Sequence, residues 1–148
     1  MSSANSRVLW MSFRPVKGAP VKQVDHLVLT AESGIFGDHY SGKSKKRQVT
    51  LMQKDYLDQV SQKMGFEVDM TMTRRNILVS DINLTELIGR KFRLGTAVLE
   101  ATGHCKPCEQ MDKTIGPGGW KAMKGLAGIT ARVIADGEVK VGDELALI

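Results

Sequence analysis

The sequence has few of the residues that staple a fold together or anchor it to a membrane. Its two cysteines, Cys105 and Cys108, lie three positions apart among 148 residues, so they cannot form a disulfide framework between distant segments. Two thiols are also too few for a four-thiolate zinc or iron–sulfur centre. No apolar run approaches the roughly 20 residues that cross a bilayer, and the first residues, MSSANSRVLWMSFRP, lack a secretory pattern. These absences predict a cytoplasmic protein without a membrane partner.

Aromatic residues are scarce as well, with two Trp, two Tyr and four Phe. The 21 basic and 16 acidic residues give a net charge of +5 at pH 7, which raises the question of an anionic partner. Nucleic acid is not favoured, because the chain offers few side chains for base stacking and no groove-reading motif. A short basic run, formed by Lys43, Lys45, Lys46 and Arg47, is either an anion site or a solvated surface.

Length and periodicity favour one mainly β domain over residues 1–148. Apolar and β-branched segments separated by close turns predict short strands at residues 7–13, 26–30, 47–52, 76–79, 91–94, 97–101, 128–135, 138–141 and 144–147. Residues 53–64 change to a helical period that ends at Gly65, and short helical turns follow Asn83 and Trp120. Asp136-Gly137 predicts a hairpin, and residues 103–119 a loop. We therefore expect a closed or nearly closed β-barrel with one longer helix and a few short helices.

The segment 103–108, GHCKPC, is the part of the chain with the most evident chemistry. Thiolate is the reactive and metal-binding form of cysteine, and His104 and Lys106 would favour it electrostatically. A thioredoxin-like pair is disfavoured because no βαβ context surrounds the motif. A haem-attachment motif would need a histidine after the second cysteine, and a zinc site would need ligands from elsewhere. The two leading alternatives are one reactive or metal-binding thiolate and two cysteines that pack as small apolar groups.

Three segments of the chain resemble the MOSC domain, a family named for the C-terminus of molybdenum cofactor sulfurases. Their order and spacing, more than any single motif, carry the resemblance, which covers about residues 30–146. The first segment is GIFGDH at 34–39 with RQVT at 47–50; the second is RRNILV at 74–79 with Leu84, Leu87, Gly89, Phe92 and Gly95; the third is CKPC at 105–108 with Gly125, Gly128, Ile129, residues 131–133, Gly142 and Asp143. The chain looks like the short, stand-alone bacterial type.

The resemblance implies a β-barrel and an association with the molybdenum cofactor, a pterin that carries a dithiolene and a phosphate (molybdopterin). In related enzymes that reduce amidoximes and hydroxylamines, a family cysteine ligates molybdenum, and the second cysteine of the pair occupies that place. The role passes by resemblance to Cys108, with a lesser cofactor-binding role for Cys105. Soft thiolate ligation of a metal already bound by sulfur is chemically reasonable.

Four further residues accompany the cysteines as candidates. Arg74 and Asn76 are expected to bind the pterin or its phosphate, since guanidinium forms paired hydrogen bonds with phosphate oxygens. Asp38 and His39 are expected to orient a ligand or transfer a proton. For each residue an ordinary structural role is the competing interpretation: a strand-edge contact for the first two, and a loop stabilised by an Asx-type hydrogen bond for the last two.

Two functions follow as hypotheses from the resemblance. One is molybdenum-dependent reduction of a small N-hydroxylated compound, with electrons from a separate reductase because the chain has no recognisable flavin or iron–sulfur motif. The other is a sulfur carrier, with a cysteine persulfide supplied by a cysteine desulfurase, or a cofactor-binding module. In the sulfurases the domain is fused to a pyridoxal-phosphate-dependent desulfurase, for which 148 residues leave no room.

Overall fold

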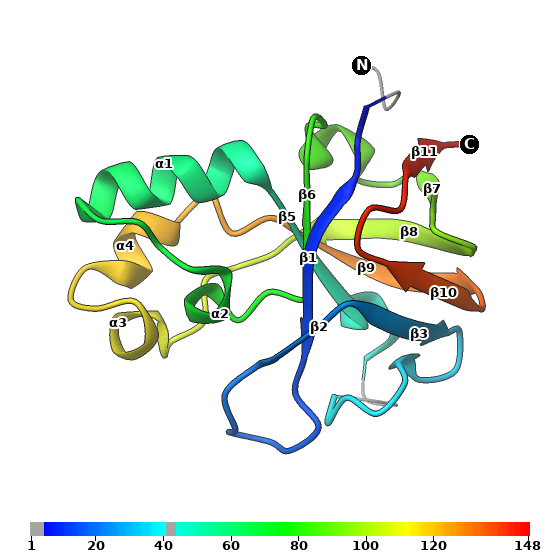
Figure 1. Ribbon diagram of the computed structural model, residues 1–148, viewed down its shortest axis with the longest axis horizontal. Coiled ribbons are helices and arrows are strands. Elements are labelled where there is room, and N and C mark those ends of the chain that lie inside the picture. Colours follow the sequence, from blue (N-terminus) through cyan, green and yellow to red (C-terminus); the bar gives the residue numbers. More distant parts are fainter. Residues whose placement is uncertain (1–4, 41–43) are drawn as a thin grey trace.

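A computed structural model describes residues 5–40 and 44–148, and Figure 1 shows its architecture. Lys43 of the basic run lies outside the described residues. The strands are β1 (Val8–Phe13), β2 (Lys22–Val24), β3 (His26–Thr30), β4 (Gly34–Ile35), β5 (Val49–Gln53), β6 (Ile77–Val79), β7 (Lys91–Leu94), β8 (Ala97–His104), β9 (Ile129–Ala135), β10 (Gly137–Lys140) and β11 (Leu145–Leu147). The helices are α1 (Lys54–Met64), α2 (Met70–Thr73), α3 (Met111–Thr114) and α4 (Gly119–Met123), with 3₁₀ turns η1 (Lys45–Arg47) and η2 (Leu84–Leu87). The prediction of a mainly β chain with one longer helix and a few short ones is confirmed.

The strands form two sheets. Eight strands follow the order β11-β7-β8-β9-β5-β6-β1-β2, and three follow the order β10-β3-β4. All pairs are antiparallel except β5 and β6, where Leu51 pairs with Ile77 in parallel. A parallel pair needs a crossover, and α1 and α2 supply it. The four helices gather beside one end of the sheets in Figure 1.

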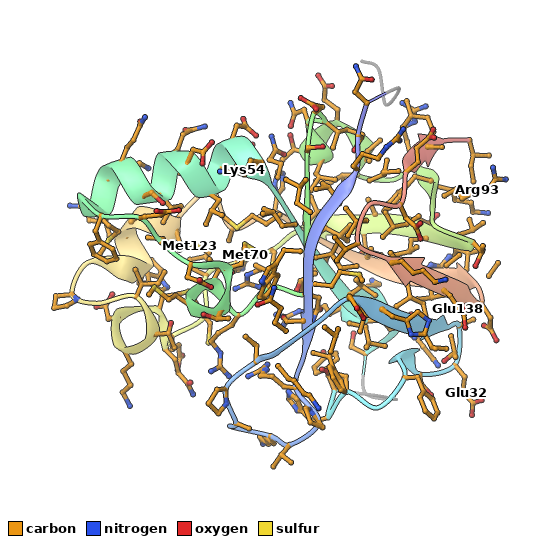
Figure 2. All side chains as sticks on the ribbon, viewed as in Figure 1. Glu32, Lys54, Met70, Arg93, Met123 and Glu138 are labelled. Carbon is orange, nitrogen blue, oxygen red and sulfur yellow. The ribbon has the colours of Figure 1, made fainter. Side chains whose placement is uncertain are left out.

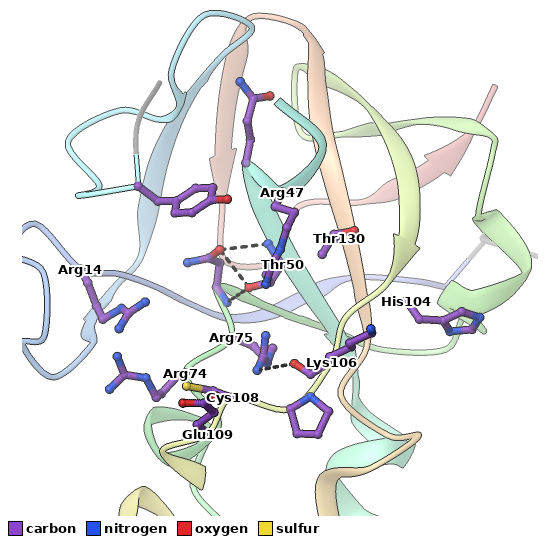
Figure 3. A pocket seen from close by; sticks show the side chains of 14 residues that line it. Arg14, Arg47, Thr50, Arg74, Arg75, His104, Lys106, Cys108, Glu109 and Thr130 are labelled. Atoms are coloured by element: carbon purple, nitrogen blue, oxygen red, sulfur yellow. Dashed lines mark hydrogen bonds between the residues drawn. The ribbon is translucent and has the colours of Figure 1, made fainter. Parts of the chain in front are cut away.

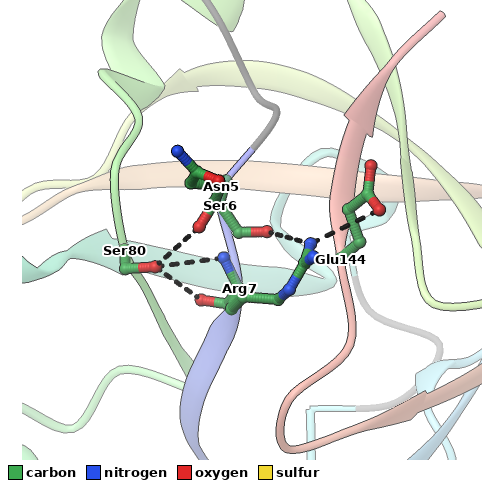
Figure 4. A network of polar contacts seen from close by, with 5 residues as sticks. All are labelled: Asn5, Ser6, Arg7, Ser80 and Glu144. Carbon is green, nitrogen blue, oxygen red and sulfur yellow. Dashed lines mark hydrogen bonds and ion pairs between the residues drawn. The ribbon is translucent and has the colours of Figure 1, made fainter.

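The expected closure into a barrel is not shown. Within residues 5–40 and 44–148, no ladder of strand pairing joins β11 to β2, and only a single bridge, Arg7 to Glu144, links the β11 side to the start of β1. A small polar network surrounds this bridge (Figure 4). Arg7 donates its backbone N–H to the Ser80 hydroxyl at 3.1 Å, and its guanidinium lies 3.3 Å from the Glu144 carboxylate. Arg7, just before β1, is thus bonded to Ser80, just after β6, and to Glu144, just before β11.

Two apolar clusters hold these layers together. The first, which we call the sheet core, contains buried side chains from both sheets, including the fully buried Phe92. The second, the helix core, lies between the helices and the sheet; Met70 and Met123 lie in it (Figure 2). Each buried apolar side chain removes surface from water, and this burial stabilises the packing of the layers. The apolar positions that alternate along the strands in the sequence are the ones that are buried. Across the described ranges, no helix has the length and apolar character needed to cross a bilayer.

The longer helix forms as the sequence predicts. Leu57 and Val60 of α1 are buried, and Gly65 adopts φ +79° and donates its N–H to the Ser61 carbonyl at 2.9 Å. Glycine reaches this left-handed conformation without a Cβ penalty, which explains why the helix ends there.

Two predictions about the second half of the chain are wrong. The Asp136-Gly137 step is not a hairpin, because β9 belongs to the large sheet and β10 pairs with β3 in the small one. A Cβ on Gly137 would lie 2.5 Å from the backbone nitrogen of Ala97, so the glycine permits a tight corner between sheets. The predicted loop at 103–119 instead contains the end of β8, the helix α3 and the first residue of α4, because Met111 and Ile115 are buried in the helix core.

Candidate functional site

A cavity of about 530 Å³ lies where the starts of β5 and β6 meet the segment after β8 (Figure 3). Residues far apart in the sequence converge on it, from Arg14 just after β1 to Thr130 at the start of β9. The lining consists of Arg14, Tyr40, Arg47, Gln48, Thr50, Arg74, Arg75, Asn76, His104, Lys106, Pro107, Cys108, Glu109 and Thr130. Three sequence-predicted site residues are among them: Cys108, Arg74 and Asn76.

The cavity is strongly basic. Four arginines and one lysine line it against a single lining carboxylate, Glu109, among the described residues. Guanidinium groups present several donors in a fixed planar arrangement that suits phosphate and carboxylate oxygens. The modest net charge of the chain is therefore concentrated locally, and the cavity is suited to an anionic ligand.

The two cysteines have different surroundings. β8 runs to His104, and the Cys105 N–H then donates to the Gly128 carbonyl at 2.9 Å, which continues the contact with β9 for one residue. Cys105 is 6% exposed and packs in the helix core, whereas Cys108 is half-buried and lines the cavity. Both thiols are free. The Gln110 N–H lies 3.5 Å from the Cys108 sulfur and is oriented to donate to it.

Arg75 lies directly behind this segment and is only 5% exposed. Its Nη1 group donates to the Cys105 sulfur, and its Nη2 group donates to the Lys106 carbonyl at 3.5 Å (Figure 3). Its Nε atom is buried without a hydrogen-bond partner in the described ranges. Burial raises the pKa of the Cys105 thiol, and the nearby charges of Arg75 and Arg47 oppose that rise. Arg75 therefore holds the cysteine segment through the Cys105 sulfur and the Lys106 carbonyl, while its Nε atom has no partner among the described residues.

Arg74 and Asn76 line the cavity with different freedom. Arg74 ends α2 at φ +59°, a conformation uncommon for a side chain larger than glycine, and its guanidinium extends toward Arg14 (Figure 3). The Asn76 side chain is already engaged. Its Oδ1 atom accepts both the N–H and the hydroxyl of Thr50 at 3.0 Å, and its Nδ2 atom donates to the Ser12 carbonyl at 3.3 Å. Asn76 thus joins β1, β5 and β6 at the wall of the cavity.

Asp38 and His39 do not belong to the lining, although their neighbour Tyr40 does. Asp38 accepts the Arg14 N–H at 2.8 Å and the Tyr40 N–H at 3.0 Å. Burial raises the pKa of Asp38, while the Tyr40 N–H and the nearby His39 oppose that rise. The ring nitrogens of His39 are buried and have no hydrogen-bond partner within the described part of the chain. The structure therefore brings Cys108, Arg74 and Asn76 together and leaves Asp38 and His39 behind the wall.

Sequence reasoning missed several lining residues, among them Arg14, Tyr40, Arg75, Glu109 and Thr130. Arg75 and Glu109 are adjacent to predicted site residues, so the motif positions already pointed to their neighbourhood. Arg14 carried no local signal, because only the pairing of β1 with β6 brings it to the cavity.

Comparisons with known proteins agree with this architecture. Residues 22–146 match the family described as the MOSC domain, and the chain belongs to that family. The crystal structure of the YuaD protein from Bacillus subtilis is similar with a TM-score of 0.85 at 23% identity, over 95% of this chain and 93% of that one.

Two YiiM structures also share the fold. The protein from Geobacillus stearothermophilus has a TM-score of 0.79 at 14% identity, over 97% of this chain and 75% of that one. The protein from Escherichia coli has a TM-score of 0.72 at 21% identity, over 96% and 69% of the two chains. A search of curated proteins gave no match.

Proposed function

We propose that the chain binds the molybdenum cofactor in the basic cavity and reduces small N-hydroxylated compounds with electrons from a separate reductase. The observation that carries this proposal is the position of Cys108, a free thiol on the wall of a cavity lined by five cationic side chains. The family is associated with this cofactor, and thiolate is a suitable ligand for a metal held by sulfur.

The donor set of the described residues fits such a cofactor better than a bare metal ion. No group of three or more His, Cys, Asp or Glu side chains within residues 5–40 and 44–148 is arranged to hold an ion. A metal that brings its own dithiolene sulfurs needs only one further ligand from the protein. Cys108 is the cysteine that reaches the cavity, whereas Cys105 is engaged by Arg75.

The surrounding residues have distinct parts in this proposal. Arg74 and Arg14 would hold the cofactor phosphate through charge-assisted hydrogen bonds. The Gln110 N–H would hold the Cys108 sulfur through a hydrogen bond, and Arg75 would keep the cysteine segment in place through the Lys106 carbonyl. Asn76 would preserve the cavity wall, because its side chain already bridges Thr50 and Ser12.

When bound, the cofactor supplies two-electron redox chemistry at the metal. Conversion of an N–OH group to N–H consumes two electrons and two protons and releases water. The electrons would come from the external reductase, and Glu109, the carboxyl group of the lining, would transfer a proton at its side-chain oxygen. An anionic or polar substrate would enter beside Lys106, which is an exposed residue of the lining.

The test is to express the protein with molybdate and measure molybdenum and pterin in the purified chain. The wild type and Cys105→Ser should retain both, whereas Cys108→Ser should lose molybdenum while remaining folded. With a chemical reductant, only the two metal-containing proteins should reduce an N-hydroxylated base. Wild-type protein that contains neither molybdenum nor pterin under these conditions would contradict the proposal.

A second function uses the same thiol. A half-buried free cysteine in a basic cavity is also suited to carry a sulfane sulfur as a persulfide, which is anionic near neutral pH. Incubation with a cysteine desulfurase and cysteine should then add the mass of one sulfur atom to Cys108 and none to Cys105. A stable adduct in a protein that lacks reductase activity would favour the carrier or cofactor-binding module over the enzyme.

A further inference from the structure

The segment 38–40 forms two hydrogen bonds with the backbone of Arg14 and a third within itself. Asp38 accepts the Arg14 N–H at 2.8 Å, and the His39 N–H donates to the Arg14 carbonyl at 2.8 Å. The second carboxylate oxygen of Asp38 accepts the Tyr40 N–H at 3.0 Å. Arg14 is therefore held on its donor and its acceptor side by residues more than twenty positions away in the sequence.

Both residues that the Asp38 carboxylate holds line the cavity. Arg14 follows the last residue of β1, where regular pairing with β2 and β6 has ended, so the strand ladder itself does not fix its orientation. Tyr40 follows the bend that Gly37 makes possible with φ +88°. In Figure 3 the Arg14 guanidinium extends toward Arg74, so the direction of this side chain determines how two cations share one anion.

We infer that Asp38 is a positioning residue that sets the direction of Arg14, and thereby the anion affinity of the cavity, without touching the ligand. Its carboxylate lies outside the lining, and each of its two oxygens accepts a backbone N–H. This inference rests on the proposed binding of a phosphate-bearing ligand, and it replaces a direct catalytic role for Asp38.

Asp38→Asn is the informative change, because it keeps the shape of the side chain and leaves only one oxygen to serve two N–H groups. Asp136→Asn is the matched control. Asp136 also accepts one backbone N–H, from Ala31 at 2.7 Å. The Asp136→Asn change alters the net charge by the same amount as Asp38→Asn, but Asp136 lies outside the cavity lining. The readout is the affinity for inorganic phosphate of protein expressed without added molybdate, measured by titration calorimetry at low ionic strength.

Loss of one hydrogen bond in the support of Arg14 should weaken phosphate binding by about three- to tenfold in Asp38→Asn, with no such change in Asp136→Asn. Arg14→Gln should weaken binding at least as much, and Asp38→Asn should add nothing in the Arg14→Gln background. This dependence on Arg14 separates a positioning role from general damage to the fold. Hydrogen exchange should also accelerate at the Arg14 and Tyr40 amides, a measurement that remains informative if the variant is less stable.

Equal phosphate affinities of Asp38→Asn and Asp136→Asn would overturn the inference, and so would additive effects of Asp38→Asn and Arg14→Gln. The molybdenum content of wild-type protein expressed with molybdate separates this result from the proposed function, since phosphate affinity is measured on protein expressed without it. A protein that shows the Asp38–Arg14 coupling but never retains molybdenum would support the inference and contradict the cofactor assignment.

Discussion

The sheet core and the basic cavity draw residues from the same strands, but the core gathers apolar side chains and the cavity gathers charged ones. The sheet core contains apolar side chains from both sheets and derives its stability from burial. The cavity gathers five cationic side chains against one carboxylate, an arrangement that costs free energy through repulsion until an anion is bound. The sheets therefore supply the stability that allows an unfavourable cluster of charge to persist beside the starts of β5 and β6. Changes in the core should therefore affect stability, and changes in the cavity should affect binding.

The largest expected effect is in the sheet core. Phe92→Ala removes a fully buried ring and should lower the free energy of unfolding by about 3–5 kcal/mol. Phe36→Ala is the matched control, because this side chain is 68% exposed and its loss should change stability by less than about 0.5 kcal/mol. Urea denaturation checks both values. Similar losses for the two variants would contradict the assignment of the core.

The next effect tests the junction between core and cavity. Gly128, whose carbonyl accepts the Cys105 N–H, has φ +89°. A Cβ at this position would lie 2.0 Å from the Leu51 carbonyl oxygen. Gly128→Ala should destabilise the protein by roughly 2–3 kcal/mol through overpacking and strain. Gly18→Ala also places alanine at positive φ but meets nothing within 4 Å, so it should cost only about 1 kcal/mol. Thermal unfolding of the pair measures the difference, which should vanish if the contact with Leu51 is unimportant.

The two cysteines should react at different rates. Thiolate is the nucleophile, so the raised pKa of Cys105 reduces its reactive fraction at any given pH, and burial limits access to it. Iodoacetamide at pH 8 should modify Cys108 at least about tenfold faster than Cys105, and the advantage should narrow as the pH rises toward the pKa of Cys105. Peptide mass spectrometry gives both rates, and modification in urea serves as the control, where the two should become similar. Faster modification of Cys105 in the native protein would reverse the assignment of the cavity thiol.

The smallest effect concerns one cation of the cavity. Arg74→Gln should weaken binding of inorganic phosphate by about three- to tenfold, and less at high salt, because it removes one charge-assisted contact. Arg93→Gln removes the same charge from an exposed position on β7 outside the cavity and should leave the affinity nearly unchanged. If both variants lose affinity equally, then net charge, and not the cavity, governs anion binding.

The fold class, α1 and several strands follow from local patterns. The alternation in KFRL and the helical spacing that ends at Gly65 are readable because buried and exposed positions recur with the period of each element. The hairpin predicted at Asp136-Gly137 is wrong because a hairpin and a corner between sheets use the same turn residues. What distinguishes them is the partner of β10, which is β3 and lies more than a hundred residues earlier in the chain.

The sequence by itself determined that the chain is mainly β and that it resembles the MOSC domain, and it singled out Cys105 and Cys108 as candidate site residues. Only the tertiary structure decided which cysteine lines the cavity and which is buried against Arg75. Arg14, Arg74 and Cys108 come from three separate segments of the chain. The sequence around each residue does not predict that the other two lie nearby. Long-range strand pairing sets the distances between these three side chains. The sequence therefore supplies the functional groups, and the packing of the sheets brings them to one site.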